Sequence, residues 1–274
     1  MRRFSKWNSD PLELQAFITS RHHPMLHIFC HYFSVVFSSR KNQLEYIYPF
    51  DKWIKHMLKD GQKGVILQRD KESYAIAPHL PCGIITPEIL ERYAAIARKY
   101  EVPCLKLTSA SRVAFLGIKE EQVDPIWEDL EADTSHIVGL CVRSVKVCPG
   151  TQFCRLAKQD SIEMGMKLDR TYHGMKVPSK MKMAVSGCKI QCAENCIKDI
   201  SLYGTVKGWT LLIGGMGGVQ PRLADMLSED LSSDEAEEMI KLIINYCKES
   251  GNRSRLGKVI DKVGLDTLRQ DILG

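Results

Sequence analysis

Four cysteines in two close pairs are the residues of this chain best suited to chemistry. Cys148 and Cys154 form a C-x5-C pair, and Cys188 and Cys192 form a C-x3-C pair, with 33 residues between the pairs. Four thiolates can hold a [4Fe–4S] cluster or a zinc ion. Paired zinc ligands usually have about two to four residues between them, so the wider C-x5-C spacing favours a cluster. A zinc site, or cysteines without a metal role, are the alternatives.

Basic residues accompany both cysteine pairs and could hold an anion beside a metal centre. Arg143 and Arg155 flank the first pair. Lys180 and Lys182 precede the second pair and would share one strand face, because strand side chains alternate. Arg112 begins an apolar strand in an earlier segment. If these segments converge, the cations line one cavity. A solvated surface charge is the alternative for each residue taken alone.

A glycine-rich loop follows the apolar segment Trp209–Ile213 and is a third candidate for ligand binding. It contains Gly214, Gly215, Gly217 and Gly218, which allow a backbone to approach a ligand closely. The order G-x-G-x-x-G is missing, which argues against a dinucleotide site. A tight turn at the end of a strand is the alternative.

The composition indicates a globular protein of a reducing compartment. The 274 residues, 44% of them hydrophobic, suffice for one large domain or two small ones. Ten cysteines without a credible signal peptide argue against a secreted disulfide framework and predict a cytoplasmic location. The net charge of +5 does not suggest nucleic acid, but it suits a protein that holds anions. The longest apolar patch, residues 27–37, is too short and too polar to span a bilayer.

Residues 1–56 differ from the rest of the chain and are interpreted as an N-terminal extension of unknown role. They contain none of the 19 glycines, although average usage would place roughly four there. Four histidines between residues 22 and 31 have near-helical spacing, but the poor patterning around them favours an extension over a metal site. Met57 offers an alternative start for the protein.

From residue 64 onward the pattern predicts regular elements. Thr86-Pro87-Glu88 is a strong helix start, with a threonine cap, a proline at the first helical position and an acid in the first turn. The other elements expected before the first cysteine pair are strands at Val65–Gln68, Tyr74–Ile76, Leu105–Leu107, Val113–Ile118 and Ile137–Val147, and a helix at Glu121–Glu131. This order fits half of a split βαβ, ferredoxin-like layout.

The second part of the chain is expected to place strands and helices around the cysteines. The predicted elements are helices at Arg155–Leu168, from Cys192 onward, after Ser232 and at Leu256–Leu273, and strands at Lys180–Val185 and Trp209–Ile213. The helix from Cys192 would put Cys192 and Cys196 on one face, and we expect Cys196 to have no metal role. The predicted fold class is therefore α+β.

Five segments, taken in order, resemble one family. They read V-R-S-V-K-V-C-P-G-T-Q-F-C-R, K-M-K-M-A-V-S-G-C-K-I-Q-C-A-E-N-C-I-K-D and G-W-T-L-L-I-G-G-M-G-G, preceded by A-P-H-L-P-C-G-I-I-T-P-E and L-K-L-T-S-A-S-R-V-A-F-L-G-I. Together they cover residues 64–226 and resemble the nitrite and sulfite reductases that contain sirohaem and a [4Fe–4S] cluster. The likeness is strongest to the sirohaem domain of assimilatory nitrite reductases and to small, single-subunit sulfite reductases.

The resemblance implies a domain layout. It places a ferredoxin-like half-domain at 57–135, an α/β sirohaem- and [4Fe–4S]-binding domain at 136–226 and a C-terminal helical segment at 227–274. Large members contain two ferredoxin-like halves and this chain has one, so a homodimer or a paired subunit could complete the cavity. No flavin or nicotinamide module is visible, so electrons would come from an external donor such as a ferredoxin.

The resemblance also implies roles for individual residues. The cluster ligands would be Cys148, Cys154, Cys188 and Cys192, of which Cys192 would also bridge to the sirohaem iron. The cations that hold the anionic substrate and the macrocycle carboxylates would be Arg112, Arg143, Lys180 and Lys182. Further cofactor contacts would come from Arg155 and from the glycines of the loop at 214–218.

Three positions depart from the family pattern. Lys189-Ile190-Gln191 stands where the family usually has a proline-containing link, and a lysine so near a cluster could raise its potential. Ala110 stands where many members place an arginine, which puts one substrate contact in doubt. Cys196 is an additional thiol.

These roles predict an oxidoreductase that reduces sulfite to sulfide with six electrons from an external donor. Reduction of nitrite to ammonia is the alternative within the same chemistry. Small stand-alone members and the lack of nitrite-reductase fusion domains favour sulfite. A non-catalytic [4Fe–4S] electron-transfer protein and a structural zinc protein are the alternatives from other classes. The expected partners are the anion and the electron donor, with no nucleic acid and no membrane span.

Overall fold

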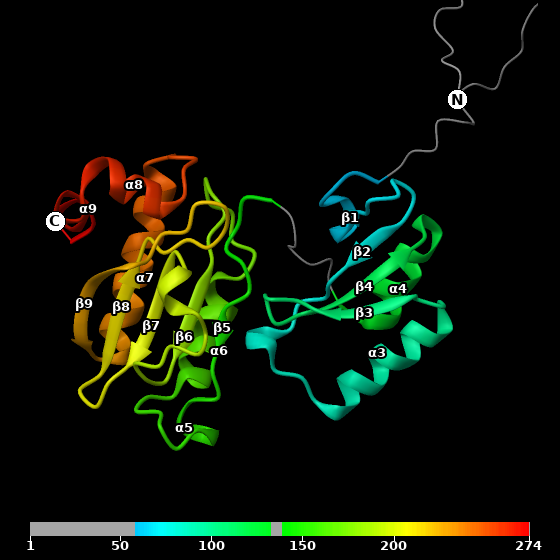
Figure 1. The fold of residues 1–274 in the computed structure, drawn as a ribbon, viewed down its shortest axis with the longest axis horizontal. Helices are drawn as coiled ribbons and strands as arrows, with labels where there is room; N and C mark the ends of the chain where they lie inside the picture. Colours follow the sequence, from blue (N-terminus) through cyan, green and yellow to red (C-terminus); the bar gives the residue numbers. More distant parts are fainter. Residues whose placement is uncertain (1–57, 133–138, 274) are drawn as a thin grey trace, which may run out of the picture. The chain divides into compact units, whose positions relative to one another are not determined.

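The computed structural model describes residues 58–132 and 139–273. The predicted N-terminal extension and the beginning of the strand predicted at Ile137–Val147 lie outside these residues. In the described part of the chain, one sheet precedes residues 133–138 and a second sheet follows them (Figure 1). No helix among the described residues combines the length and the apolarity that crossing a bilayer requires.

The first sheet is antiparallel, with the strand order β1-β2-β4-β3. Its strands are β1 (Ile66–Leu67), β2 (Tyr74–Ile76), β3 (Cys104–Leu107) and β4 (Val113–Ile118), accompanied by the helices α3 (Pro87–Lys99) and α4 (Val123–Leu130). The predicted strands are confirmed, although β1 retains only the middle of the predicted range. The order strand, strand, helix, strand, strand, helix agrees with the predicted ferredoxin-like layout.

Local chemistry explains where α3 begins and which face it buries. The Thr86 hydroxyl accepts a hydrogen bond from the Ile89 amide at 3.4 Å, and a proline follows at the first helical position. Tyr93 and Ile96 are buried, and Tyr93 meets Phe115 of β4 edge-to-face with 5.3 Å between the ring centroids. α4 buries its apolar residues in the same core, so both helices cover the same face of the sheet.

The second sheet carries the cysteines and has the strand order β5-β6-β7-β8-β9. Its strands are β5 (Lys146–Val147), β6 (Met183–Ser186), β7 (Ile200–Gly204), β8 (Trp209–Ile213) and β9 (Asp225–Leu231). β5, β6 and β7 are parallel, while β8 and β9 continue the sheet in antiparallel pairing. All four residues of β6 are buried, as expected for a parallel strand in the middle of a sheet.

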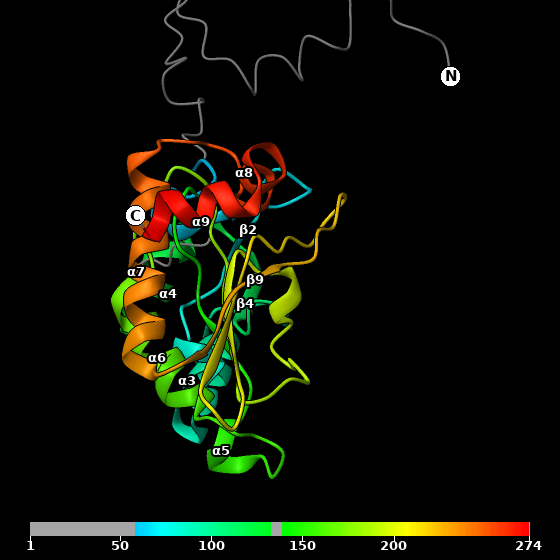
Figure 2. The same cartoon turned by 90° about the vertical axis from the view of Figure 1, so that its left-hand side faces the viewer.

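Helices cover one side of the second sheet, and loops cover the other (Figure 2). The helices are α6 (Ser161–Tyr172), α7 (Ser233–Glu249), α8 (Leu256–Val263) and α9 (Leu265–Leu273). α7 begins with a capping box, in which Ser232 and Glu235 exchange side-chain-to-backbone hydrogen bonds. The buried face of α7 shares one hydrophobic core with β6, β7 and β8. The C-terminal helices therefore pack on the sheet that bears the cysteines.

The single helix predicted at Arg155–Leu168 is wrong in its first part. A short helix, α5 (Gly150–Phe153), ends before Cys154, and α6 begins only at Ser161. Asp160 caps α6, because its carboxylate accepts hydrogen bonds from two amides of the first turn. Two amides of the intervening loop bond to the Gly187 carbonyl instead of to a helical partner.

The helix predicted from Cys192 onward is also wrong. Turns occupy this region and lead into η5 (Asn195–Ile197), a single turn of 3-10 helix. Gln191 and Glu194 have φ angles of 56° and 60°, in the left-handed region that interrupts a right-handed helix. Cys192 and Cys196 therefore do not share a helical face.

Three further differences concern the strands of the second sheet. The strand predicted at Lys180–Val185 begins at Met183, and the strand predicted at Ile137–Val147 is regular only at β5, with isolated bridges at Cys141 and Val142. β7 and β9 were not predicted. The segment before β7 contains charged residues and the segment before β9 is rich in glycine, and both strands pair with neighbouring strands of the sheet.

Candidate active site

Both cysteine pairs lie in loops at the same end of the second sheet. β5 and β6 are neighbouring parallel strands in which Val147 pairs with Val185, so the chain leaves both strands at one edge. Cys148 directly follows β5, and Cys188 follows β6 after one glycine. The fold therefore brings the two predicted ligand pairs to one edge of the sheet.

Gly187 is a point of contact between the two cysteine loops. Its amide donates a hydrogen bond to Cys148 Sγ at 3.1 Å, and a Cβ at this position would lie 2.8 Å from Ala157 Cβ. An N–H group directed at sulfur stabilises the negative charge of a thiolate. Cys148 is buried, with its Sγ 3.3 Å from the Ser161 hydroxyl, while Cys154 is half-buried beyond α5. The first cysteine thus has surroundings that suit a metal-bound thiolate.

Charged and amide side chains hold the loop of the second pair. The two carboxylate oxygens of Glu194 bind Lys146 and Lys198, each at 2.8 Å. The hydrogen bonds from these two ammonium groups lower the pKa of Glu194 to about 2. The buried Asn195 accepts a hydrogen bond from the Ser186 hydroxyl and donates one to a carbonyl of β7. The C-x3-C loop is therefore anchored to both neighbouring strands.

The four cysteines fit a [4Fe–4S] cluster, in which the ligands do not all have to bind the same metal ion. Within the described residues, no three His, Cys, Asp or Glu side chains are grouped so that they could hold one metal ion. In a [4Fe–4S] cluster, four thiolates bind four separate irons. Between Cys188 and Cys192, the side chain of Gln191 has a buried oxygen without a hydrogen-bond partner. Such acceptors are rare in folded proteins, and a group bound at this loop would complete its contacts.

Three of the predicted substrate cations lie at the end of β5 and β6 that is opposite to the cysteines. They are Arg143, Lys180 and Lys182. The Arg143 amide donates to the Met181 carbonyl at 2.8 Å, which places Arg143 beside the segment that carries Lys180 and Lys182. Met181 is buried, whereas the two lysines on either side of it are exposed. Loss of water, followed by the charge of Lys180, lowers the pKa of Lys182. The segments predicted to converge are thus side by side.

Arg112 is the fourth cation, and 4% of its surface is exposed. Its guanidinium donates to the Ser144 hydroxyl from Nε at 2.8 Å and from Nη2 at 2.6 Å, and to the Ala77 carbonyl at 3.2 Å. Its burial and the charge of Arg143 lower the pKa of Arg112 to about 10. No carboxylate of the described residues is among its hydrogen-bond partners. A buried cation of this kind is well placed to receive an anion.

The segment from Cys188 to Asp199 connects the cysteine end of the sheet with the cation end. Because β7 is parallel to β6, the chain must return along the sheet between these strands. At the end of the return, the Asp199 amide donates to the Lys182 carbonyl at 3.0 Å. An extended chain rises about 3.3 Å per residue, so Lys182 and Cys188 are at most about 20 Å apart. Cys192 lies on the returning segment, between the two ends.

The glycine-rich loop after β8 packs against the returning segment. A Cβ on the buried Gly215 would lie 2.6 Å from the carbonyl oxygens of Cys196 and Lys198, so this position requires glycine for packing alone. Gly217, Gly218 and Arg155 are exposed. Cofactor binding by Arg155, Gly214, Gly215, Gly217 and Gly218 stays a prediction.

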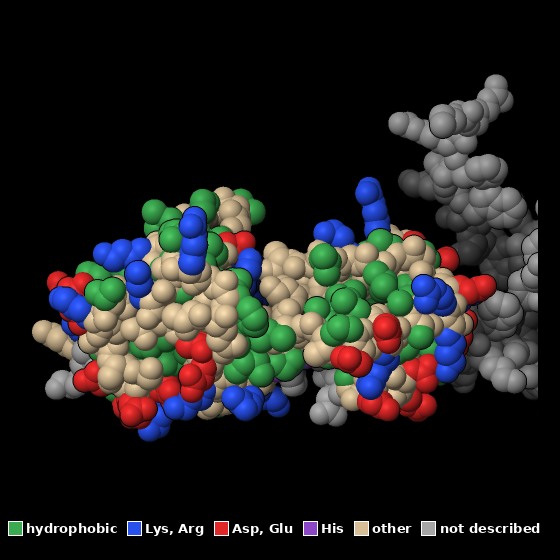
Figure 3. Space-filling model, turned by 90° about the horizontal axis from the view of Figure 1, so that it is seen from below, with side chains coloured by type: hydrophobic (Ala, Val, Ile, Leu, Met, Phe, Trp, Pro, Cys, Tyr) green, Lys and Arg blue, Asp and Glu red, His purple; other side chains and the backbone are tan. Residues whose placement is uncertain are grey.

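Exposed apolar and basic side chains border the cysteine loops. Phe153 directly precedes Cys154 and is 80% exposed, and Ile190, inside the C-x3-C loop, is 62% exposed. Arg155 and Lys189 are exposed beside them. Seen from the α5 side, the protein surface carries hydrophobic, basic and acidic side chains (Figure 3). Such a surface is suited to a partner protein with acidic residues around an apolar centre.

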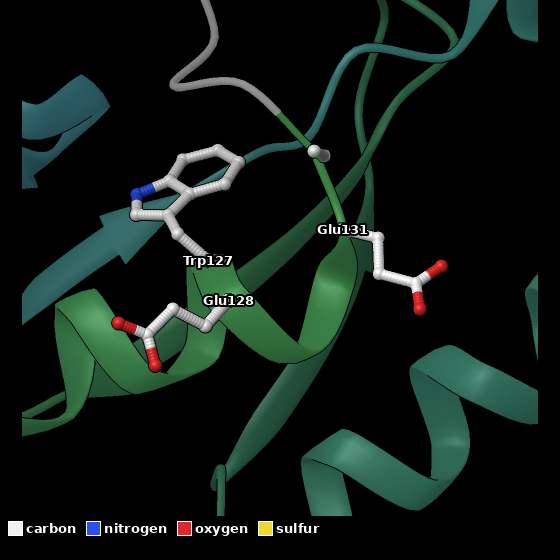
Figure 4. Close-up of a pocket in the computed structure, with 4 residues that line it drawn as sticks. Trp127, Glu128 and Glu131 are labelled. Atoms are coloured by element: carbon white, nitrogen blue, oxygen red, sulfur yellow. The ribbon is translucent and has the colours of Figure 1, made fainter.

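A hollow in the half-domain is a weaker candidate for the substrate. It is lined by Trp127, Glu128, Glu131 and Ala132 at the end of α4 (Figure 4). Its two carboxylates would repel a small anion, and its position is on the half-domain rather than among the cations described above. The hollow therefore does not change the assignment of the site.

Sequence reasoning missed the polar residues that surround the predicted cations. They are His79, Ser144, Asp169, His173 and Asp199. Asp169 and Asp199 are buried acids inside otherwise apolar patterns, which is an unusual position for a carboxylate. A buried acid between apolar residues was therefore the available sequence signal for Asp169 and Asp199. His79 was part of the segment A-P-H-L-P, but nothing in that segment singled it out.

Comparison with protein families supports the assignment of both halves. The family described as "Nitrite/Sulfite reductase ferredoxin-like half domain" matches residues 66–133. The family described as "Nitrite and sulphite reductase 4Fe-4S domain" matches residues 138–273, which include all four cysteines and the C-terminal helices. The matched regions agree with the two sheets of the structure.

Individual relatives point in the same direction. An assimilatory-type sulfite reductase of Nitratidesulfovibrio vulgaris is 45% identical over 218 residues, which are 79% of this chain and 100% of the relative. A nitrite reductase [NAD(P)H] of Bacillus subtilis is 36% identical over 200 residues, which are 73% of this chain and 25% of that relative.

Solved structures show the same fold. The NirA protein of Mycobacterium tuberculosis aligns with a TM-score of 0.65 at 20% identity, covering 78% of this chain and 43% of that protein. Dissimilatory sulfite reductase I aligns with a TM-score of 0.66 at 17% identity, covering 73% of this chain and 69% of that protein.

Proposed function

Because this chain belongs to the nitrite and sulphite reductase family of oxidoreductases, we propose that it reduces sulfite to sulfide with electrons from an external donor. The observation that carries the proposal is the pair of cysteine loops at adjacent strand ends, with cations on the same strands and the buried Arg112 beside them. Sulfite is preferred to nitrite because the chain spans an assimilatory-type sulfite reductase along its whole length.

The proposed cofactors are a [4Fe–4S] cluster and sirohaem. Cys148, Cys154, Cys188 and Cys192 would hold the cluster, and Cys192 would also bind the sirohaem iron from its place on the returning segment. When bound, this cofactor pair would supply the electrons for the reduction of a small oxyanion. The hydrogen bond from the Gly187 amide to Cys148 Sγ supports a ligand role for that sulfur.

The chain's own contribution to the reaction is to bind the anion and supply protons. Arg112, Arg143, Lys180 and Lys182 would attract sulfite and stabilise the negative charge that reduction adds. The overall reaction takes six electrons and seven protons to convert sulfite into hydrosulfide and three waters. Lys182 has a lowered pKa, so its ammonium group gives up a proton more readily than an ordinary lysine. We assign Lys182 as a proton donor at this site.

The electron donor is proposed to dock at the cysteine loops. Phe153 and Ile190 offer exposed apolar contacts there, and Arg155 and Lys189 offer positive charge, which suits an acidic protein such as a ferredoxin. We also propose a cytoplasmic location, because the ten cysteines call for a reducing compartment, and a homodimer or paired subunit that adds the second half of the cavity.

Reduction of nitrite to ammonia is the second candidate, since several relatives are named nitrite reductases. The discriminating experiment measures kcat/KM for both anions with anaerobically purified protein and reduced methyl viologen. The proposal predicts a higher value for sulfite than for nitrite, with sulfide as the product. A higher value for nitrite would reverse the substrate assignment. Turnover of neither anion would favour a non-catalytic electron-transfer protein.

A further inference from the structure

A continuous series of hydrogen bonds joins the buried Arg112 to the buried Asp169. The Arg112 guanidinium contacts Ser144 Oγ at 2.8 and 2.6 Å. Ser144 Oγ lies 3.0 Å from Nδ1 of His79, and Nε2 of His79 lies 2.7 Å from Asp169 Oδ2. The other Asp169 oxygen accepts a hydrogen bond from the Val145 amide at 2.9 Å. We name these residues, from Arg112 through Ser144 and His79 to Asp169, the arginine relay.

The direction of every hydrogen bond in the arginine relay is determined. A guanidinium can only donate, so Arg112 occupies both lone pairs of the Ser144 hydroxyl. The hydroxyl proton must therefore go to Nδ1 of His79, which has to be an acceptor. Nε2 of His79 then carries the proton of the neutral ring and donates it to Asp169. A neutral histidine with its proton on Nε2 satisfies every contact.

His173 supports the same arrangement from a second side. Its Nε2 lies 3.0 Å from Nη2 of Arg112 and must accept that hydrogen bond. Its ring stacks on the ring of His79, with 3.5 Å between the centroids and 7° between the planes. The orientation of Arg112 thus depends on His79 through the Ser144 hydroxyl and through the stacked ring.

The arginine relay is not a hydrolytic triad, although it contains a serine, a histidine and an aspartate. Ser144 is 7% exposed, and both lone pairs of its oxygen are occupied by Arg112. A nucleophile needs one of those lone pairs free to attack a substrate. The contacts instead make the serine a fixed acceptor for the guanidinium.

Among the groups that counteract the fall in the pKa of Arg112, Asp169 has the largest effect. The two charges are separated by neutral groups, and the charge of Asp169 acts against the fall in the pKa of Arg112. Four of the five N–H bonds of Arg112 are directed at Ser144, Ala77 and His173. The guanidinium is therefore fixed in orientation while its charge is not cancelled by a contacting carboxylate.

We propose that Asp169 and His79 are positioning residues, which act through Ser144 to hold the Arg112 guanidinium in the orientation that binds the anionic substrate. The proposal rests on the function proposed above, in which Arg112 is one of the substrate cations. It adds the three polar residues Ser144, His79 and Asp169 to the site. Removal of the Asp169 charge is expected to act at a distance, on anion affinity.

The substitution Asp169→Asn tests the arginine relay with almost no change in volume. If the amide oxygen of the new asparagine keeps the hydrogen bond from the Val145 amide, the NH2 group of the asparagine faces the N–H of His79. His79 must then move its proton to Nδ1, which donates to Ser144 and displaces one bond from Arg112. We expect the sulfite dissociation constant, measured by spectral titration of the purified holoprotein, to rise about tenfold.

A double-mutant cycle separates positioning from a general structural effect. If Asp169 acts through Ser144, then Asp169→Asn adds little to the affinity loss already caused by Ser144→Ala. His79→Gln, which can accept from Ser144 and donate to Asp169, should retain more affinity than His79→Leu. The matched control is Asp261→Asn, which removes an exposed carboxylate paired with Arg222 and should leave the dissociation constant unchanged.

The outcomes are distinct. Wild-type affinity in folded Asp169→Asn protein, or losses that multiply in the double variant, would overturn the positioning role while leaving the proposed function intact. A wild-type holoprotein that neither binds nor reduces sulfite would instead overturn the proposed function, and the positioning role with it. If Asp169→Asn fails to fold, the comparison of His79→Gln with His79→Leu decides in its place.

Discussion

Lys182 and Asp199 exchange two hydrogen bonds that fix the start of β6 to the end of the returning segment. The Lys182 amide donates to the Asp199 carboxylate at 2.6 Å, and the Asp199 amide donates to the Lys182 carbonyl at 3.0 Å. Arg255, just before α8, binds both oxygens of the same carboxylate at 2.6 Å. One buried aspartate therefore ties a predicted substrate cation to the C-terminal helices.

Replacement of Asp199 by asparagine should destabilise the protein strongly. Asp199 is 1% exposed, and the change would leave the Arg255 guanidinium without its carboxylate. The loss of one partner from such a pair costs about 3 kcal/mol in the free energy of unfolding. Urea denaturation followed by circular dichroism measures this loss. Asp230→Asn, which breaks an exposed pair with Lys207, should cost less than about 1 kcal/mol, and equal losses in both variants would contradict the prediction.

The loop of the second cysteine pair should lose a stabilising contribution in acid. The pKa of Glu194 is about 2 in the folded protein, against 4.5 for a glutamate without such partners, so the folded state favours its charged form. Its contribution to stability is present above pH 4.5 and is lost as the pH falls toward 2. Thermal melting of wild type and Glu194→Gln between about pH 6 and about pH 2.5 should show a difference in Tm that shrinks through this window. A difference that is constant with pH would speak against the ion pairs.

Single serine substitutions should separate the cluster ligands from the additional cysteine. Cys148→Ser, Cys154→Ser, Cys188→Ser and Cys192→Ser should each cause loss of most of the acid-labile sulfide, because each removes one of four iron–thiolate bonds. Cys196→Ser should retain it, since Cys196 lies on η5 with its carbonyl bound to the Ala224 amide. Wild-type sulfide content in a variant of the first group would remove that residue from the ligand set.

The thiols of the buried Cys82 and the half-buried Cys247 should resist alkylation. Burial raises the pKa of Cys82 and of Cys247 to about 12, so almost no thiolate is present near neutral pH. Cys104 is exposed on β3 and serves as the internal control. Peptide mass spectrometry after a short treatment with iodoacetamide at about pH 8 should find Cys104 modified and Cys82 and Cys247 unmodified. Rapid labelling of Cys82 would show that its contact with α6 opens readily.

Much of the fold could be predicted because local signals were strong. Thr86 and the proline after it predicted the start of α3, alternation around Lys106 predicted β3, and an apolar run predicted β4. The path after Cys188 could not be predicted, because it depends on contacts that are distant in sequence. Ser186 bonds to Asn195 and to the amide of Ala193, and these contacts favour turns where the sequence pattern suggested a helix.

The candidate site also contains residues that the sequence predicted and residues that it did not. The four cysteines and the cations beside them were visible as spacing along the chain. The arginine relay was not visible, because His79 and Asp169 are 90 residues apart and meet only when the half-domain packs on α6. The only local sign of that contact in the sequence was Asp169, a carboxylate among the buried residues of α6. Polar networks between distant segments therefore need the structure.

The measurement that tests the account most directly is an absorption spectrum of anaerobically purified protein, with iron and acid-labile sulfide determined on the same sample. A bound sirohaem and [4Fe–4S] cluster should give the Soret and long-wavelength bands of an isobacteriochlorin, together with about five irons and about four sulfides per chain. A colourless protein with one zinc per chain, or a broad brown absorption with about four irons and no macrocycle bands, would contradict it.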